Sequence, residues 1–168
     1  MNKNQAVLSK QIPEVLCMLL PLMDDILLVP TVSVAEMANL RSFDDVENTP
    51  EWFFGFYTWR GLSVPVVGYE VLNGGDLPLL STQGRIAVLN CADDNPDLPF
   101  IGIITQNIPR IARVEEPDIV SDDSSTVNTF DLMAVKIGSE MYKIPDVVTI
   151  KNAYLALGIQ APGALFGA

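Results

Sequence analysis

The alternation of apolar and polar positions along the chain predicts a fold made mainly of short β strands. Short apolar runs are separated by clusters of Gly, Pro, Asn and Asp, which is the pattern of strands joined by turns. The predicted strands lie at 15–20, 26–30, 61–72, 85–91, 100–106 and 110–116, with two more within 133–150. At least eight such strands are typical of small barrels or of a sandwich.

Helical periodicity is scarce in this chain. The segment 151–158 is the best helix candidate, and Gly158 would end it. The segment 32–40 fits either one helical turn or a strand that bends. The acidic, Ser/Thr-rich segment 114–130 is expected to be a long mobile connection. These patterns predict an all-β fold with a minor helix, in one domain because 168 residues suit a single domain.

The stretch 52–59 concentrates aromatic side chains, with six of the thirteen in the chain. Strict alternation along one strand would place Phe54 and Phe56 on one face, and Phe53, Tyr57 and Trp59 on the other. One strand can hardly hide so many rings, so we expect some of them to be surface anchors. Aromatic and arginine side chains dominate binding hot spots, and Arg60 follows this stretch directly. Composition alone favours a binding surface and a packed core about equally.

Charge and composition exclude several classes of function. The net charge of −11 and a pI near 4.2 disfavour nucleic acids and anionic membrane surfaces as partners. The chain contains no histidine, which removes histidine-based nucleophile activation, zinc sites with histidine, and a phospho-accepting histidine. Cys17 and Cys91 are expected to be buried free thiols. The apolar run that precedes Asp24 is too short to cross a bilayer, so no direct membrane insertion and a cytoplasmic location are expected.

No spacing of acidic residues argues for catalysis or for a metal site. Asp24 and Asp25 would suit the magnesium site of a receiver domain only among alternating strands and helices, which the pattern lacks. A turn with two solvated carboxylates is therefore expected there. Gly74 and Gly75 follow a predicted strand without the spaced glycines of a phosphate-binding loop. The sequence predicts no catalytic residue, no metal site and no cofactor.

Three segments carry a more specific signal: ILLVPTVSVAEM (26–37), NTP (48–50) and FFGFYTWRGLSVPVV (53–67). Together they resemble the first half of a CheW-type chemotaxis adaptor domain. In that family a strand with a Val-x-Glu element leads to a Pro-containing segment. A Gly-x-x-x-x-Arg-Gly strand and a Pro-Val continuation follow. A looser match extends the resemblance over roughly residues 12–158.

The resemblance implies two small five-stranded barrels packed on each other, with 1–11 as an N-terminal tail and 159–168 as a flexible C-terminal tail. It also implies a non-enzymatic adaptor that couples the tips of methyl-accepting chemoreceptors to the regulatory domain of a CheA-type histidine kinase, within a two-component system. The family residues implicated in receptor coupling fall on Val34, Glu36, Gly55 and Arg60, and the ring-rich stretch adds Trp59 as a candidate. Arg60 is interpreted either as a donor at the docking face or as an internal tie between two strands, and the two roles are compatible.

The sequence also departs from the family pattern. Thr58 and Trp59 stand where the family usually has Asn and an aliphatic residue, Gly68 replaces a common Asp, and 106–107 lacks the expected acidic element. These features resemble the adaptors of pilus-associated chemosensory systems (the ChpC/PilI type), which implies control of twitching motility by type IV pili. Two alternatives stay open: a small ligand-binding β-barrel, and a metal-dependent phosphoesterase without histidine.

Overall fold

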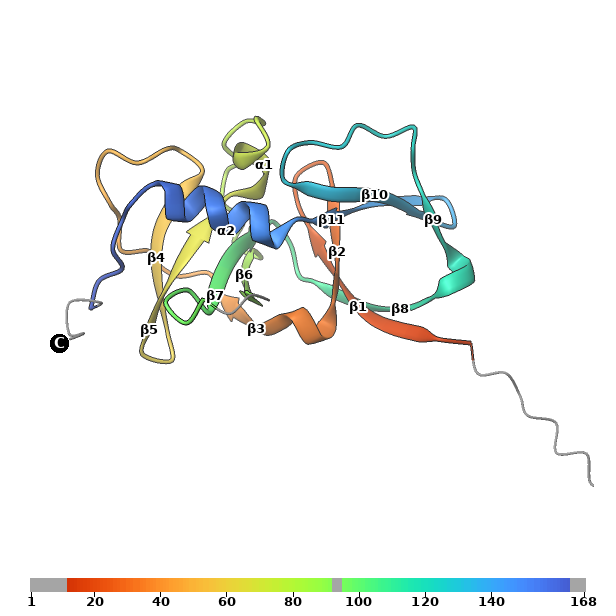
Figure 1. Ribbon diagram of the computed structural model, residues 1–168, viewed down its shortest axis with the longest axis horizontal. Helices are drawn as coiled ribbons and strands as arrows, with labels where there is room; N and C mark the ends of the chain where they lie inside the picture. The colour runs from red at the N-terminus through yellow and green to blue at the C-terminus, as the bar shows by residue number, and fades with distance from the viewer. Residues whose placement is uncertain (1–11, 92–94, 164–168) are drawn as a thin grey trace, which may run out of the picture.

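The computed structural model describes residues 12–91 and 95–163, which form two β sheets packed side by side (Figure 1). The strands are β1 (Glu14–Pro21), β2 (Ile26–Pro30), β3 (Val34–Asn39), β4 (Phe53–Trp59), β5 (Leu62–Val67), β6 (Arg85–Asn90), β7 (Phe100–Thr105), β8 (Arg110–Glu115), β9 (Ile119–Ser121), β10 (Asp131–Ile137) and β11 (Glu140–Pro145). The helices are α1 (Tyr69–Leu72) and α2 (Val147–Ala156), with 3₁₀ turns η1 (Thr31–Ser33) and η2 (Glu116–Asp118). The predicted all-β fold with a minor helix is confirmed.

The two sheets come from different parts of the chain. The first is six-stranded, in the order β8-β1-β2-β11-β10-β9, and takes its strands from both ends of the sequence. The second is five-stranded, in the order β3-β6-β7-β5-β4, and comes from the middle. The expected five strands therefore hold for the second sheet but not for the first. In the part of the chain that the structure describes, neither backbone ladder closes on itself.

The main core lies between the sheets, and α2 lies across the five-stranded sheet (Figure 1). Ile150 and Tyr154 of α2 are buried in this core, and the Tyr154 ring packs against Phe53 and Phe56 of β4. The helix starts earlier than the predicted 151. Its start is set by Asp146, whose carboxylate accepts a hydrogen bond from the Thr149 backbone N–H at 3.1 Å.

Other boundaries also differ from the prediction, each for a local reason. The expected strand 61–72 ends at Val67, and its last part forms α1. The segment 32–40 contains both predicted structures, a helical turn and a bent strand. The turn η1 leads into β3, whose pairing is irregular between Val34 and Glu36. The expected mobile connection 114–130 is wrong in part, since it contains η2 and β9, and β9 pairs with β10.

A buried polar network joins the two sheets. The side chain of Asp131 on β10 is fully buried and accepts hydrogen bonds from the hydroxyl of Tyr69, from Asn73 Nδ2 at 3.0 Å and from the backbone N–H of Asn128 at 2.8 Å. Lys143 Nζ lies 3.4 Å from the Asp131 carboxylate. Tyr69 and Asn73 belong to the segment after β5, so the network fixes one sheet against the other. Burial and the bond to Asp131 raise the pKa of Tyr69 far above its ordinary value, so its hydroxyl remains a donor.

Candidate functional site

The aromatic strand β4 is interrupted by a bulge at Gly55. The pairing of β4 with β5 shifts between Phe53 and Gly55, and Gly55 has a φ of +109°. The shift reverses the alternation of side chains, so Phe53 and Phe56 face the core between the sheets, whereas Tyr57 and Trp59 face a second core. The predicted assignment of the rings to faces is therefore wrong after residue 54.

Gly55 is required by a close approach of the chain to itself. A Cβ atom at this position would lie 2.4 Å from the carbonyl oxygen of Asp44. That oxygen accepts the Phe56 N–H at 3.0 Å, and the Asp44 N–H donates to the Phe56 carbonyl at 2.8 Å. A side chain at this position would therefore collide with the chain's own backbone at Asp44.

Most of the rings in the stretch 52–59 are core residues. Phe53, Phe56, Tyr57 and Trp59 are buried, while Trp52 and Phe54 are half-buried. Trp59 is only 8% exposed and stacks edge-on with Phe100 at 4.8 Å between ring centroids. The expectation that Trp59 is a surface anchor does not fit this burial, because too little of the ring is free to contact a partner.

Arg60 and Gly61 form the two-residue turn between β4 and β5. Their φ angles are +50° and +77°, and Trp59 pairs with Leu62 directly before and after the turn. Positive φ at both central residues identifies a type I′ turn, which matches the twist of a hairpin. Arginine rarely adopts this conformation, so its presence indicates that the side chain has a role.

Glu36, Trp59 and Arg60 form a cluster at the rim of the five-stranded sheet. Glu36 Oε2 accepts a hydrogen bond from Trp59 Nε1 at 3.1 Å and from Arg60 Nη2 at 2.8 Å. The Arg60 guanidinium also lies 4.9 Å from the Trp59 ring centroid, within the range of a cation–π contact. Because β3 and β4 are the two ends of the sheet order, this cluster connects the edges of the curved sheet through side chains. The sequence left open whether Arg60 ties two strands together, and its hydrogen bond to Glu36 of β3 is such a tie.

The cluster leaves its cation accessible. The Arg60 side chain is 70% exposed and that of Glu36 40% exposed. The hydrogen bonds from Trp59 and from Arg60 lower the pKa of Glu36, so the carboxylate stays ionised at neutral pH. A guanidinium has five N–H donors, and those not directed at Glu36 can bind a carboxylate or a backbone oxygen of another molecule. The site can therefore bind a partner, and among its described residues it offers no activated nucleophile.

The other two candidate residues lie apart from this cluster. Val34 begins β3, is half-buried and packs against the core between the sheets. Gly55 lies at the bulge described above. The structure thus brings together three of the five predicted residues, and the remaining two shape the strands that carry them.

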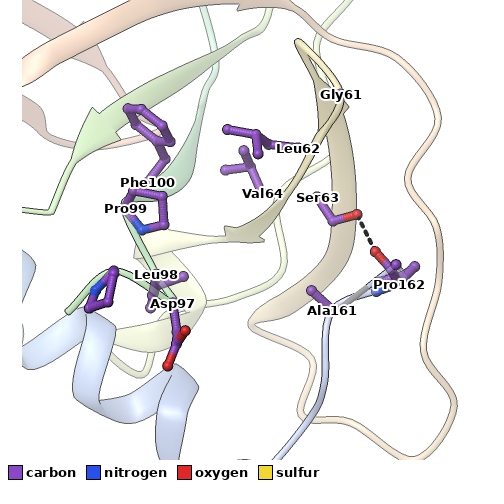
Figure 2. Close-up of a pocket in the computed structure, with 12 residues that line it drawn as sticks. Gly61, Leu62, Ser63, Val64, Asp97, Leu98, Pro99, Phe100, Ala161 and Pro162 are labelled. Carbon is purple, nitrogen blue, oxygen red and sulfur yellow. Dashed lines mark hydrogen bonds between the residues drawn. The ribbon is translucent and has the colours of Figure 1, made fainter. Parts of the chain in front are cut away.

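A cavity of about 280 Å³ lies beside the Arg60–Gly61 turn (Figure 2). Leu62 and Val64 of β5 form one wall, Asp97–Phe100 another, and the segment 161–163 a third. Ser63 Oγ donates a hydrogen bond to the Pro162 carbonyl at 2.9 Å, which holds that segment against β5 (Figure 2). Residues 159–163 were expected to belong to a flexible tail, but Ile159 and Ala161 pack against the core between the sheets. Residues 1–11 and 164–168 lie outside the described residues. Sequence reasoning missed this cavity because its walls are far apart along the chain.

The acidic residues give no sign of a metal centre within 12–91 and 95–163. No group of three or more acidic or cysteine side chains there could hold a metal ion. Asp25 instead pairs with Lys143 at 3.3 Å. Cys17 is a buried free thiol, and Cys91 is half-buried. No described helix has the length and hydropathy needed to cross a membrane.

The fold and the cluster define a class of protein: a β module of two packed sheets with an exposed ionic cluster at the rim of the five-stranded sheet. Residues 16–153 match the CheW-like domain family, and the chain belongs to that family. Among solved structures it is similar to the scaffolding protein TtCheW from Thermoanaerobacter tengcongensis, with 18% identity and a TM-score of 0.67. That match covers 79% of this chain and 89% of TtCheW. No curated protein sequence matches the chain.

Proposed function

We propose that this protein is a non-enzymatic cytoplasmic adaptor that couples methyl-accepting chemoreceptors to a CheA-type histidine kinase. Membership of the CheW-like family supports this proposal, as does the likeness in fold to a scaffolding protein. The main observation in its favour is the exposed guanidinium of Arg60. A hydrogen bond to Glu36 and contact with the buried Trp59 ring hold this guanidinium in one orientation.

The receptor tip docks near Arg60 in this proposal. An arginine that is already oriented loses less conformational entropy on binding than a free one, which makes it a suitable hot spot. The cavity between Leu62 and Pro162 lies beside the turn and offers apolar walls to a side chain of the docked helical hairpin. Val34, Glu36 and Gly55 contribute indirectly, because they position the strands and the guanidinium.

The kinase regulatory domain binds a different surface, barrel against barrel. Simultaneous binding of receptor and kinase is what makes the protein a bridge. A signal passes if the adaptor has different affinities for two arrangements of its neighbours, and no chemistry in the adaptor is required.

We also propose that the adaptor serves a pilus-associated system that controls twitching motility. Its departures from the usual family pattern are coupled in space. A Cβ at Gly68 would lie 2.5 Å from the Phe54 ring, so the phenylalanine on β4 and the glycine in place of Asp depend on each other. Coordinated replacement of this kind supports a divergent subtype with its own partners.

Affinity purification of the tagged protein from its native cells tests the assignment. We expect a CheA-type kinase and at least one methyl-accepting receptor among the captured proteins, and pilus components encoded or localised with them. Capture of neither the kinase nor a receptor contradicts the adaptor role. Hydrolysis of a generic phosphoester by the pure protein with magnesium would instead support the phosphoesterase alternative.

A further inference from the structure

Strands β5 and β7 lie side by side in the five-stranded sheet but separate at their N-terminal ends. Both strands are fully described, and their parallel pairing is limited to Val66 and Val67 at the end of β5. The first residues of β5, Leu62–Val64, line the cavity of about 280 Å³ instead, and Leu98–Phe100 form another of its walls (Figure 2). The cavity is therefore a gap between two diverging strands, next to the Arg60–Gly61 turn.

A short segment near the C-terminal end of the described chain closes one side of this gap. Residues 161–163, the strap, follow α2 and form the third wall of the cavity. Ala161 packs against the core between the sheets, and Ser63 Oγ donates a hydrogen bond to the Pro162 carbonyl at 2.9 Å (Figure 2). The strap thus lies against the part of β5 that borders the proposed docking site.

The strap is held more weakly than a strand of the sheet. Proline has no N–H, so Pro162 cannot donate to a backbone ladder. Both Pro162 and Gly163 are exposed. A side-chain hydrogen bond such as that from Ser63 changes an equilibrium constant by about two- to tenfold. The strap can therefore lift from β5 while the sheet beneath it stays folded.

We propose that the strap is an autoinhibitory contact, which covers this part of β5 in the free adaptor and lifts when the receptor tip binds. This role rests on the proposed docking of the receptor near Arg60. The cavity admits a side chain, but a helix with its side chains is about 10–12 Å across and cannot enter it. Lifting the strap joins the cavity to the exposed side chain of Leu62 and gives the helix room beside Arg60.

Receptor binding and closure of the strap compete for the same surface in this arrangement. The apparent association constant for the receptor is the intrinsic constant multiplied by the fraction of molecules whose strap is open. Loss of the Ser63 hydrogen bond raises that fraction and strengthens receptor binding. A strap that formed part of the docking surface would give the opposite sign, so the affinity distinguishes the two roles.

Thiol accessibility measures the opening of the strap without any partner. Ala161→Cys, in a Cys17→Ala and Cys91→Ser background, places one thiol in the strap, and Gln160→Cys places an exposed control thiol one residue earlier. Reaction with iodoacetamide should be slower at position 161 than at position 160. Adding Ser63→Ala should speed the reaction at position 161 by about two- to tenfold and leave that at position 160 unchanged. Adding Ser63→Thr, which keeps a hydroxyl, should leave both rates unchanged.

Two results of the thiol experiment would overturn the proposal. One is a reaction at position 161 that is equally fast with and without Ser63→Ala. The other is a thiol at position 161 that reacts as fast as the thiol at position 160. In either case the hydrogen bond from Ser63 does not hold the strap against β5. Circular dichroism of each variant shows whether global unfolding contributes to a faster reaction.

The affinity for a receptor-tip fragment from the same cells, measured by isothermal titration calorimetry, tests the autoinhibition itself. Ser63→Ala and a chain that ends at Ile159, which lacks the strap, should each bind the fragment at least about twofold more tightly than the wild type. Ser63→Thr and a chain that ends at Gly163, which both keep the strap, are the matched controls and should bind like the wild type.

The same titration separates failure of the autoinhibition from failure of the proposed function. Equal or weaker binding by Ser63→Ala and by the chain that ends at Ile159 would overturn the autoinhibition and leave the adaptor role intact. Absence of binding by every variant, the wild type included, would contradict the docking of the receptor and the autoinhibition together.

Discussion

At the scale of single residues, Arg60 combines an unusual backbone conformation with an exposed charge. Its left-handed φ of +50° suits glycine or asparagine better than arginine, and the ion pair with Glu36 is largely solvated. Exposed ion pairs contribute about 0–1 kcal/mol to the free energy of unfolding. Stability alone therefore does not account for an arginine at this turn, which agrees with the proposed role of Arg60 in binding the receptor.

Arg60→Asn separates the two roles of this residue. Asparagine keeps the left-handed turn and removes the guanidinium, so the thermal midpoint should fall by less than about 3 °C. Arg113→Asn is the matched control, because Arg113 forms a similarly exposed pair with Glu14 on the other sheet. Thermal unfolding followed by circular dichroism measures both. A fall of 10 °C or more in Arg60→Asn alone would show that Arg60 acts mainly as a structural tie.

Trp59 supports Arg60 from the core and does not itself form part of the exposed surface. Because the ring is buried, Trp59→Glu should cost about 3 kcal/mol or more, and a loss of partner binding in that variant would report unfolding. Trp59→Phe keeps an aromatic ring in the core and removes the Nε1–H donor to Glu36. It should lower the free energy of unfolding by about 1–2 kcal/mol in chemical denaturation. A cost above 4 kcal/mol would contradict this assignment, and receptor capture should weaken only partly because Arg60 still contacts Glu36.

At the scale of elements, the bulge in β4 decides which rings face which core. The strands themselves follow from the alternation of residue types, which is why most were predicted. The bulge was not predicted, although a glycine inside an aromatic strand is a recognised signal of one. Its position depends on how closely Asp44 approaches, and that contact is set by the tertiary fold.

Gly55→Ala tests the bulge. The added Cβ would meet the Asp44 carbonyl at 2.4 Å in a left-handed backbone, so the cost should be at least about 2 kcal/mol. Gly74→Ala is the matched control, because Gly74 also has a positive φ but no atom within 4 Å of the added Cβ. Its cost should be about 1 kcal/mol. Equal free energies of unfolding for the two variants, measured in urea, would show that backbone strain alone matters and that the close approach does not.

The candidate site shows the same limit of sequence reasoning. The resemblance named Glu36 and Arg60 as candidates, and the two side chains meet in the structure. The hydrogen bond from Trp59 to Glu36 depends on the curvature that brings the edges of β3 and β4 together, and the sequence does not show that curvature. The start of α2 was misplaced because Asp146 was assigned to a strand, although an Asp three residues before a Thr is a plausible helix cap. Contacts between distant segments, such as that of Ser63 with Pro162, cannot be read from the sequence around either residue.

At the scale of the whole molecule, the relative position of the sheets depends on the network around Asp131. Tyr69 has a raised pKa in the folded state, since burial and the bond to Asp131 disfavour its ionised form. In the unfolded chain the same tyrosine ionises near its ordinary pKa of 10.0. Its contribution is therefore fully present below pH 10, and it is lost as the pH rises further because ionisation favours the unfolded state.

Tyr69→Phe tests this contribution. The free energy of unfolding of the wild type should fall above pH 10 more steeply than that of Tyr69→Phe, by up to about 1.4 kcal/mol per pH unit. Tyr154, whose pKa is also raised by burial, is present in both proteins and cancels in the comparison. At pH 7 the variant should be less stable by about 1–3 kcal/mol because Asp131 loses a donor. Parallel pH profiles for the two proteins would contradict the assignment of Tyr69.

The bridging role is the central claim, and a three-component assembly measures it most directly. The adaptor is mixed with the regulatory domain of the CheA-type kinase and a receptor-tip fragment from the same cells, and the mass of the complex is measured by size-exclusion chromatography with light scattering. We expect wild type and Arg113→Asn to unite all three components, and Arg60→Asn to retain the kinase domain while losing the receptor fragment. A complex of all three that forms equally well with Arg60→Asn, or a receptor fragment that binds the kinase domain as tightly without the adaptor, would contradict the account.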